Sequence, residues 1–105
     1  MQIEQQDLWQ KVMDLSRQLL DFARSDNWDE ACCQEPVRNE LLATFFSQPL
    51  DDSDRTLVVQ DIKQIQEWDD ETISLVKTAR HKISDTLSDL RKGRRGLNAY
   101  QRNDK

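Results

Sequence analysis

The last apolar stripe of this chain is longer than the rest of the protein can cover. From Asp54 to about Lys92 the sequence contains no Pro or Gly, and apolar residues recur at helical spacing. At 1.5 Å per residue, such a helix is roughly 57 Å long, whereas each of the two helices predicted before it is roughly 30 Å long. Part of the apolar face of the final helix therefore needs another covering surface.

The composition favours an all-α fold. Leu, Ile, Val and Phe account for 25 of the 105 residues, enough for a folded core, and there are only two Gly and two Pro. Alternating strand patterns are absent from the sequence. We therefore predict one antiparallel helical bundle of two shorter helices and one long helix, followed by a short tail helix or a disordered tail.

The first helix is predicted over residues 3–24, because apolar residues recur there at steps of three and four. Its main stripe consists of Leu8, Val12, Leu15, Leu19 and Phe22, and it is widened by Trp9, Met13, Leu20 and Ala23. The pattern indicates a helix with one face in the core.

The second helix is predicted over residues 27–47, with Asn27 as N-cap and Glu30 in a capping-box-like position. Pro36 lies inside this segment and cannot donate a hydrogen bond to the carbonyl of Cys32. We expect a kink near Pro36 or a break between residues 34 and 37. The alternative is two short helices, with Pro36 at the first position of the second.

The third helix is predicted over residues 53–92, with Gly93 as its C-cap. Asp69 interrupts its apolar seam. The first two helices can cover it to about Leu75. The residues expected to extend beyond that cover are Val76, Ala79, Ile83, Leu87 and Leu90.

Several solutions are open for this uncovered stripe. Exposed apolar surface of this size marks an interaction site, so a client protein, a second copy of the chain or the chain's own tail could cover it. Alternatively, the third helix bends or breaks and the whole chain closes into one ordinary bundle. We expect the stripe to be a binding groove.

The charge is divided between the body and the tail. Residues 91–105 carry a net charge of +5, whereas the whole chain carries −5, so residues 1–90 carry −10. We therefore distinguish a helical bundle at residues 1–92 from a basic tail at residues 93–105. The acidic net charge argues against nucleic acid as a direct partner.

The sequence does not indicate an enzyme. Acidic residues such as Asp61, Glu67 and Asp85 are expected on solvent faces, and His81 stands alone between Arg80 and Lys82. We predict no catalytic residues, no metal site and no cofactor. Cys32 and Cys33 are adjacent, a geometry unsuited to a disulfide between them.

The expected location is the cytosol. The first residues are polar and acidic, unlike a signal peptide, and no run of 18 apolar residues is present, so we expect no membrane insertion. Reduced cysteines fit the same compartment.

The order of these features resembles the FliT-type flagellar export chaperones. A Leu-rich first helix is followed by a polar turn and Asn27-Trp28-Asp29-Glu30. Glu35 and Arg38 follow in the second helix, and a loop leads into one long third helix. The chain closes with Leu97-Asn98-Ala99-Tyr100 after a basic run. The resemblance covers about residues 8–100.

The resemblance implies a cytoplasmic bacterial chaperone of type III flagellar export. Such a protein binds the C-terminal segment of the filament-cap protein FliD, prevents early assembly, and delivers FliD to the export gate and ATPase complex. It also implies that Leu97 and Tyr100 form an autoinhibitory tail over the client-binding groove.

Two alternative functions use the same surface. An anti-activator would bind the flagellar master transcription regulator through the groove, as enteric relatives do. A structural helical homodimer would cover the stripe with a second copy and would bind no client.

Overall fold

The computed structural model describes the backbone of residues 1–103 and the side chains of residues 1–94. It contains three helices, α1 (Ile3–Arg24), α2 (Trp28–Phe46) and α3 (Asp52–Asn103), and no strand in the described backbone. The predicted all-α class, with two shorter helices and one long helix, is confirmed.

The chain divides into two compact units, at residues Met1–Leu75 and Val76–Lys105. We call them unit 1 and unit 2 and describe each by itself. The boundary between the two units lies within α3, after Leu75.

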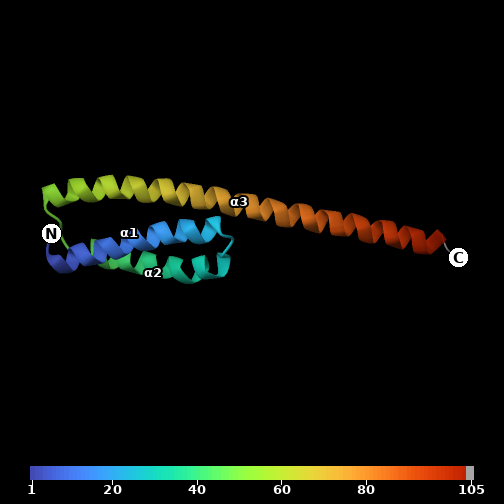
Figure 1. The fold of residues 1–105 in the computed structure, drawn as a ribbon, viewed down its shortest axis with the longest axis horizontal. Helices are drawn as coiled ribbons and strands as arrows, with labels where there is room; N and C mark the ends of the chain where they lie inside the picture. The colour runs from blue at the N-terminus through green and yellow to red at the C-terminus, as the bar shows by residue number, and fades with distance from the viewer. Residues whose placement is uncertain (104–105) are drawn as a thin grey trace. The chain divides into compact units, whose positions relative to one another are not determined.

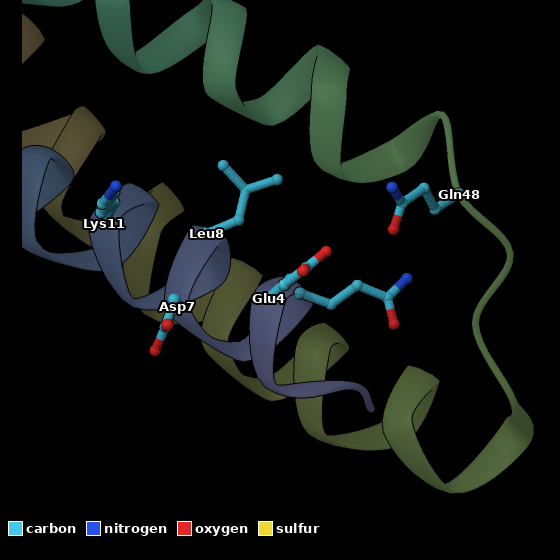
Figure 2. Close-up of a pocket in the computed structure, with 6 residues that line it drawn as sticks. Glu4, Asp7, Leu8, Lys11 and Gln48 are labelled. Atoms are coloured by element: carbon cyan, nitrogen blue, oxygen red, sulfur yellow. The ribbon is translucent and has the colours of Figure 1, made fainter.

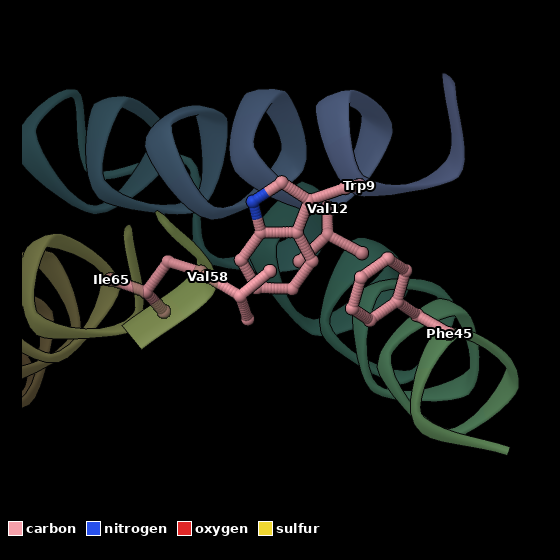
Figure 3. Packing of buried hydrophobic residues seen from close by; sticks show 5 residues of the cluster. All are labelled: Trp9, Val12, Phe45, Val58 and Ile65. Carbon is pink, nitrogen blue, oxygen red and sulfur yellow. The ribbon is translucent and has the colours of Figure 1, made fainter. Parts of the chain in front are cut away.

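Unit 1 is a three-helix arrangement in which α1 and α2 run antiparallel and the first part of α3 returns alongside them (Figure 1). Its core cluster takes at least one residue from each helix and is built around the indole of Trp9 (Figure 3). The ring centroids of Trp9 and Phe45 lie 4.7 Å apart. The buried members of this cluster are Trp9, Val12, Phe45, Val58 and Ile65.

The buried face of α1 is rotated from the predicted stripe. Leu8, Leu15 and Phe22 are only half-buried, whereas Ser16 is completely buried. A hydroxyl is tolerated there because Ser16 Oγ donates a 2.7 Å hydrogen bond to the carbonyl of Val12, one turn earlier. The buried residues of α1 are Trp9, Val12, Ser16, Leu19, Leu20 and Ala23.

The turn between α1 and α2 differs from the predicted cap. Asn27 precedes α2, but its side chain makes no capping hydrogen bond. Instead, Asp26 adopts a positive φ of 58°, and the N–H of Asn27 donates to the carbonyl of Phe22 at 2.8 Å. This is the hydrogen-bond pattern of a Schellman motif, with an aspartate in the usual glycine position.

Pro36 does not interrupt α2, so the expected break between residues 34 and 37 is wrong. Pro36 and Cys32 are both exposed. Because the carbonyl that loses its intrahelical donor belongs to an exposed residue, water can replace that donor and the proline costs less than in a buried helix.

A buried polar contact joins the three helices of unit 1. Arg38 of α2 is only 8% exposed, and its Nη1 lies 3.3 Å from Ser16 Oγ of α1 and 3.1 Å from Asp69 Oδ1 of α3. Asp69, which we predicted only as a gap in the apolar seam, is therefore the carboxylate that compensates a buried guanidinium.

A second acidic residue of α3 also faces inward. Asp61 is half-buried, and its Oδ2 accepts a 2.8 Å hydrogen bond from Trp9 Nε1. Our placement of Asp61 on a solvent face was therefore wrong, because the indole N–H of a buried tryptophan needs an acceptor.

The long helix begins with a capping aspartate. Asp51 Oδ1 accepts the backbone N–H of Asp54 at 2.8 Å and the hydroxyl of Ser53 at 3.0 Å. The donated backbone hydrogen bond, with a smaller contribution from Ser53, holds the pKa of the Asp51 carboxyl below its ordinary value of 3.8.

The far end of α3 also differs from the prediction. The helix continues through Gly93 to Asn103 instead of ending near Lys92. A glycine C-cap requires a positive φ, and Gly93 does not have one. Gly93 is therefore an ordinary helical position in this structure.

The contact of Arg38 with Asp69 gives a first prediction. Asp69→Leu leaves a buried, uncompensated guanidinium and should lower the free energy of unfolding by about 3–5 kcal/mol. Arg38→Met should cost less, because the side chain of Asp69 is 35% exposed and can be hydrated. The double variant Arg38→Met/Asp69→Leu should regain most of the free energy of unfolding that Asp69→Leu loses. Urea unfolding followed by circular dichroism measures the free energy of unfolding of each variant. If the double variant loses as much stability as the two single variants added together, the prediction is contradicted.

The Asp51 cap gives a second prediction. Because the folded-state pKa of Asp51 is lowered, its stabilising contribution is present above the ordinary pKa and is lost as the pH falls through the folded-state value. Asp51→Asn keeps a capping oxygen but removes this titration. The gap in urea midpoint between wild type and this variant should therefore narrow from pH 5 to pH 3 (roughly one unit either side of the ordinary value). A constant gap contradicts the assignment.

Candidate functional site

The five predicted groove residues all lie on the part of α3 that belongs to unit 2. Three of them are exposed: Ile83 at 61%, Leu87 at 48% and Leu90 at 65%. Val76 and Ala79 are half-buried. We call the five the unit 2 stripe: Val76, Ala79, Ile83, Leu87 and Leu90.

The spacing of the unit 2 stripe places it on one face of α3. The five residues follow one another at steps of three, four, four and three. At 100° per residue, their Cα positions span an arc of about 80°. One narrow apolar face of this kind is typical of the contact seam between two packed helices.

The surroundings of the unit 2 stripe are mainly cationic. Between residues 76 and 94 there are six Lys or Arg residues and two carboxylates. Lys77, Arg80 and Lys82 are all exposed. Residues 76–94 therefore combine an exposed aliphatic face with a positive net charge, although residues 1–90 as a whole are acidic.

The autoinhibitory residues that the resemblance implies are Leu97 and Tyr100. Both lie within the helical backbone of α3. Their side chains lie outside the described ones, so their role stays a prediction.

Two other surface features of unit 1 are a polar hollow and a pair of free cysteines. The hollow in Figure 2 lies between α1 and the loop after α2, and its lining is mostly polar. It brings Glu4 and Asp7 near Lys11, but those groups belong to exposed positions of one helix. Cys32 and Cys33 are free and exposed.

The described residues offer no metal-binding cluster and no membrane-spanning helix. They contain no group of three or more His, Cys, Asp or Glu side chains arranged to hold a metal ion. Within the same part of the chain, no helix has the length and apolarity needed to cross a membrane.

Sequence reasoning missed two features. The first is the buried contact of Arg38 with Ser16 and Asp69, signalled only by an acidic residue inside an apolar seam. The second is exposed apolar surface in unit 1, which includes Phe46, Leu57 and Val59. The signal for it was the run Leu57-Val58-Val59, since one helix face cannot bury three consecutive apolar residues.

These observations define a small all-helical protein with a three-helix core and an exposed apolar helix face. The family model described as flagellar protein FliT matches residues 6–102, nearly the whole chain. The chain therefore belongs to the FliT family of flagellar proteins, and the resemblance seen in the sequence is confirmed. This family is not a family of enzymes. No curated protein and no solved structure matches the chain.

The exposure of the unit 2 stripe gives a third prediction. Ile83→Asp should leave the helicity within about a tenth of the wild-type value, because a 61% exposed position can hydrate a carboxylate. Ile65→Asp is the matched control and should unfold unit 1, because Ile65 is 6% exposed in the core cluster. Circular dichroism measures both. Loss of the fold in Ile83→Asp would show that Ile83 is a core residue.

Proposed function

We propose that this protein is a cytosolic flagellar export chaperone that binds the C-terminal segment of the filament-cap protein FliD through the unit 2 stripe and delivers it to the export gate and ATPase complex. Membership of the FliT family supports a flagellar role. The observation that carries the proposal is the exposure of Ile83, Leu87 and Leu90 on one helix face.

Burial of these side chains can supply a large part of the free energy of specific binding. Complete burial of a large aliphatic side chain contributes about 1.5–3 kcal/mol. Because Ile83, Leu87 and Leu90 are about half to two-thirds exposed, covering all three provides roughly 3–5 kcal/mol as an upper bound. A dissociation constant of 1 μM corresponds to about 8 kcal/mol, so the stripe can supply much of the free energy of a reversible chaperone complex.

The proposed mode of binding is helix against helix. An amphipathic client segment lays an apolar seam along the unit 2 stripe, with anchors at helical spacing. Because Lys77, Arg80 and Lys82 lie in the same segment, carboxylates beside the client's apolar seam would add favourable contacts. The client's assembly surface is then covered until it is transferred.

The proposed autoinhibition requires a change in α3. In a continuous helix, residues 97 and 100 cannot fold back onto positions 76–90 of the same helix. The helix must therefore open at the glycines of residues 93–96. Gly93 suits such an opening, because glycine lowers helix stability by about 0.5–1 kcal/mol relative to alanine.

Client binding provides the fourth prediction. In calorimetric titration with a FliD C-terminal fragment, Ile83→Asp should weaken binding at least about tenfold, the effect of some 1.4 kcal/mol. Leu57→Asp is the matched control, because Leu57 is 59% exposed but lies in unit 1, and it should bind as wild type does. Equal losses in both variants would contradict a site at the unit 2 stripe.

Light scattering separates this function from a structural homodimer. A chain that stays dimeric at every concentration and does not bind the FliD fragment would refute the chaperone proposal.

Autoinhibition provides the fifth prediction. Truncation after Lys92 should tighten binding of the FliD fragment, because the client no longer competes with the tail. Gly93→Ala should act in the same direction, since a Cβ at Gly93 meets no atom within 4 Å and the straight helix is stabilised. Equal or weaker affinity after truncation would refute the role of the tail.

A further inference from the structure

Unit 2 has cations along one edge of its apolar stripe. At 100° per residue, Arg80 and Arg91 lie within about 80° of the centre of the unit 2 stripe. The two carboxylates of residues 76–94, Asp85 and Asp89, lie about 120–160° from that centre. Among the described side chains, no carboxylate lies within 4.0 Å of Arg80 or Arg91. This edge of the stripe is therefore positive, and the acids of the same segment lie on the other side of the helix.

A polar hollow adjoins the same edge. It has a volume of about 400 Å³ and is lined by Ser84, Leu87, Ser88, Arg91 and Lys92. Two hydroxyl groups and two cations therefore lie beside one residue of the unit 2 stripe, with no carboxylate in the lining. Hydroxyl, ammonium and guanidinium groups all donate hydrogen bonds to phosphate oxygens. Donors for a phosphate group thus lie next to an apolar side chain.

We infer that unit 2 binds an anionic lipid surface, with the unit 2 stripe at the boundary of the acyl chains and with Arg80, Arg91 and the two serines at the headgroup phosphates. A helix binds in this way when it combines an apolar face, low overall hydrophobicity and cationic side chains. The helix then lies in the headgroup layer and does not cross the bilayer. This inference does not rest on the proposed binding of FliD.

The positions of the charges disfavour a second copy as the occupant. Stripe-to-stripe packing would bring Arg80 and Arg91 of both copies to one seam, and Asp85 and Asp89 lie too far around the helix to compensate them. The chain's own tail does not reach the stripe while α3 is continuous.

The spacing of the arginines favours lipid over an acidic peptide. Arg80 and Arg91 are eleven residues apart, roughly 16 Å along the helix axis. A peptide would need carboxylates in a matching register, whereas a fluid layer of anionic headgroups supplies charge at any position. The same layer offers a continuous apolar region to Ile83, Leu87 and Leu90, which are all exposed.

The test uses the full chain in co-sedimentation with two kinds of vesicle, one of phosphatidylcholine and one of phosphatidylcholine and phosphatidylglycerol in equal parts. The chain should bind the phosphatidylglycerol vesicles at least about tenfold more tightly. This binding should weaken when the salt concentration is raised from about 0.1 M to about 1 M, because salt screens the surface charge. Equal binding to both kinds of vesicle, or binding to neither, would overturn the inference.

Charge variants then locate the cationic edge. Arg80→Gln/Arg91→Gln should weaken binding to the phosphatidylglycerol vesicles about 25-fold, because each cation near an anionic surface contributes about fivefold. Arg55→Gln/Lys63→Gln is the matched control, since it removes two charges from exposed positions of unit 1 and should bind as wild type does. Equal losses in the two double variants would refute the site.

An uncharged variant tests the apolar contact. Leu90→Gln should weaken vesicle binding about tenfold without a change in charge, because Leu90 is 65% exposed and would leave the acyl boundary. Leu57→Gln is the matched control, because Leu57 is 59% exposed but lies in unit 1. An unchanged affinity in Leu90→Gln would refute the contact of the stripe with lipid.

A synthetic amphipathic helix with Leu on one face and Glu on the other represents the competing occupant. If this peptide binds unit 2 and the phosphatidylglycerol vesicles do not, the cationic edge serves a protein ligand and the inference fails. Vesicle binding by a chain that does not bind the FliD fragment would support the inference and refute only the chaperone proposal.

Discussion

The three helices of unit 1 depend on one buried guanidinium for their alignment. Apolar side chains such as Val12, Val58 and Ile65 pack without directional preference, and neighbouring helix turns offer similar surfaces. Arg38 is different, because its Nη1 must meet Ser16 on α1 and Asp69 on α3 together. A slip of one helix by a turn would leave the guanidinium buried without its carboxylate, a costly state. The ion pair thus selects one register.

Local patterns predicted that the three helices exist, although two of the expected boundary residues, Asn27 and Gly93, do not cap a helix. The spacing of apolar residues predicted α1 at residues 3–24, the range observed. Errors arose where a residue's effect depends on its surroundings. Pro36 lies on an exposed face where water can replace the lost donor, and Gly93 kept helical dihedrals instead of capping. The inward positions of Asp61 and Asp69 depend on partners 52 and 31 residues away in the chain.

For the candidate sites too, a local sequence pattern was predictable, whereas an arrangement of residues distant in the chain was not. The unit 2 stripe lies on one helix, so its spacing alone indicated the face, and three of its five residues are exposed. By contrast, a hollow at the corner between α2 and α3 combines Phe46 from α2, Leu50 from the loop and Val59 from α3. No periodic pattern joins these three elements, because their proximity arises only when the chain turns between α2 and α3. Surfaces assembled at a turn require coordinates.

The distribution of indole rings makes the two units optically distinct. Trp9 lies in the core, Trp28 begins α2, and Trp68 lies beneath the guanidinium of Arg17 at 5.7 Å. All three tryptophans of the chain therefore belong to unit 1. Their fluorescence emission follows the melting of unit 1 alone, whereas the far-ultraviolet helix signal sums both units. A helix signal that falls before the emission changes would reveal fraying confined to unit 2.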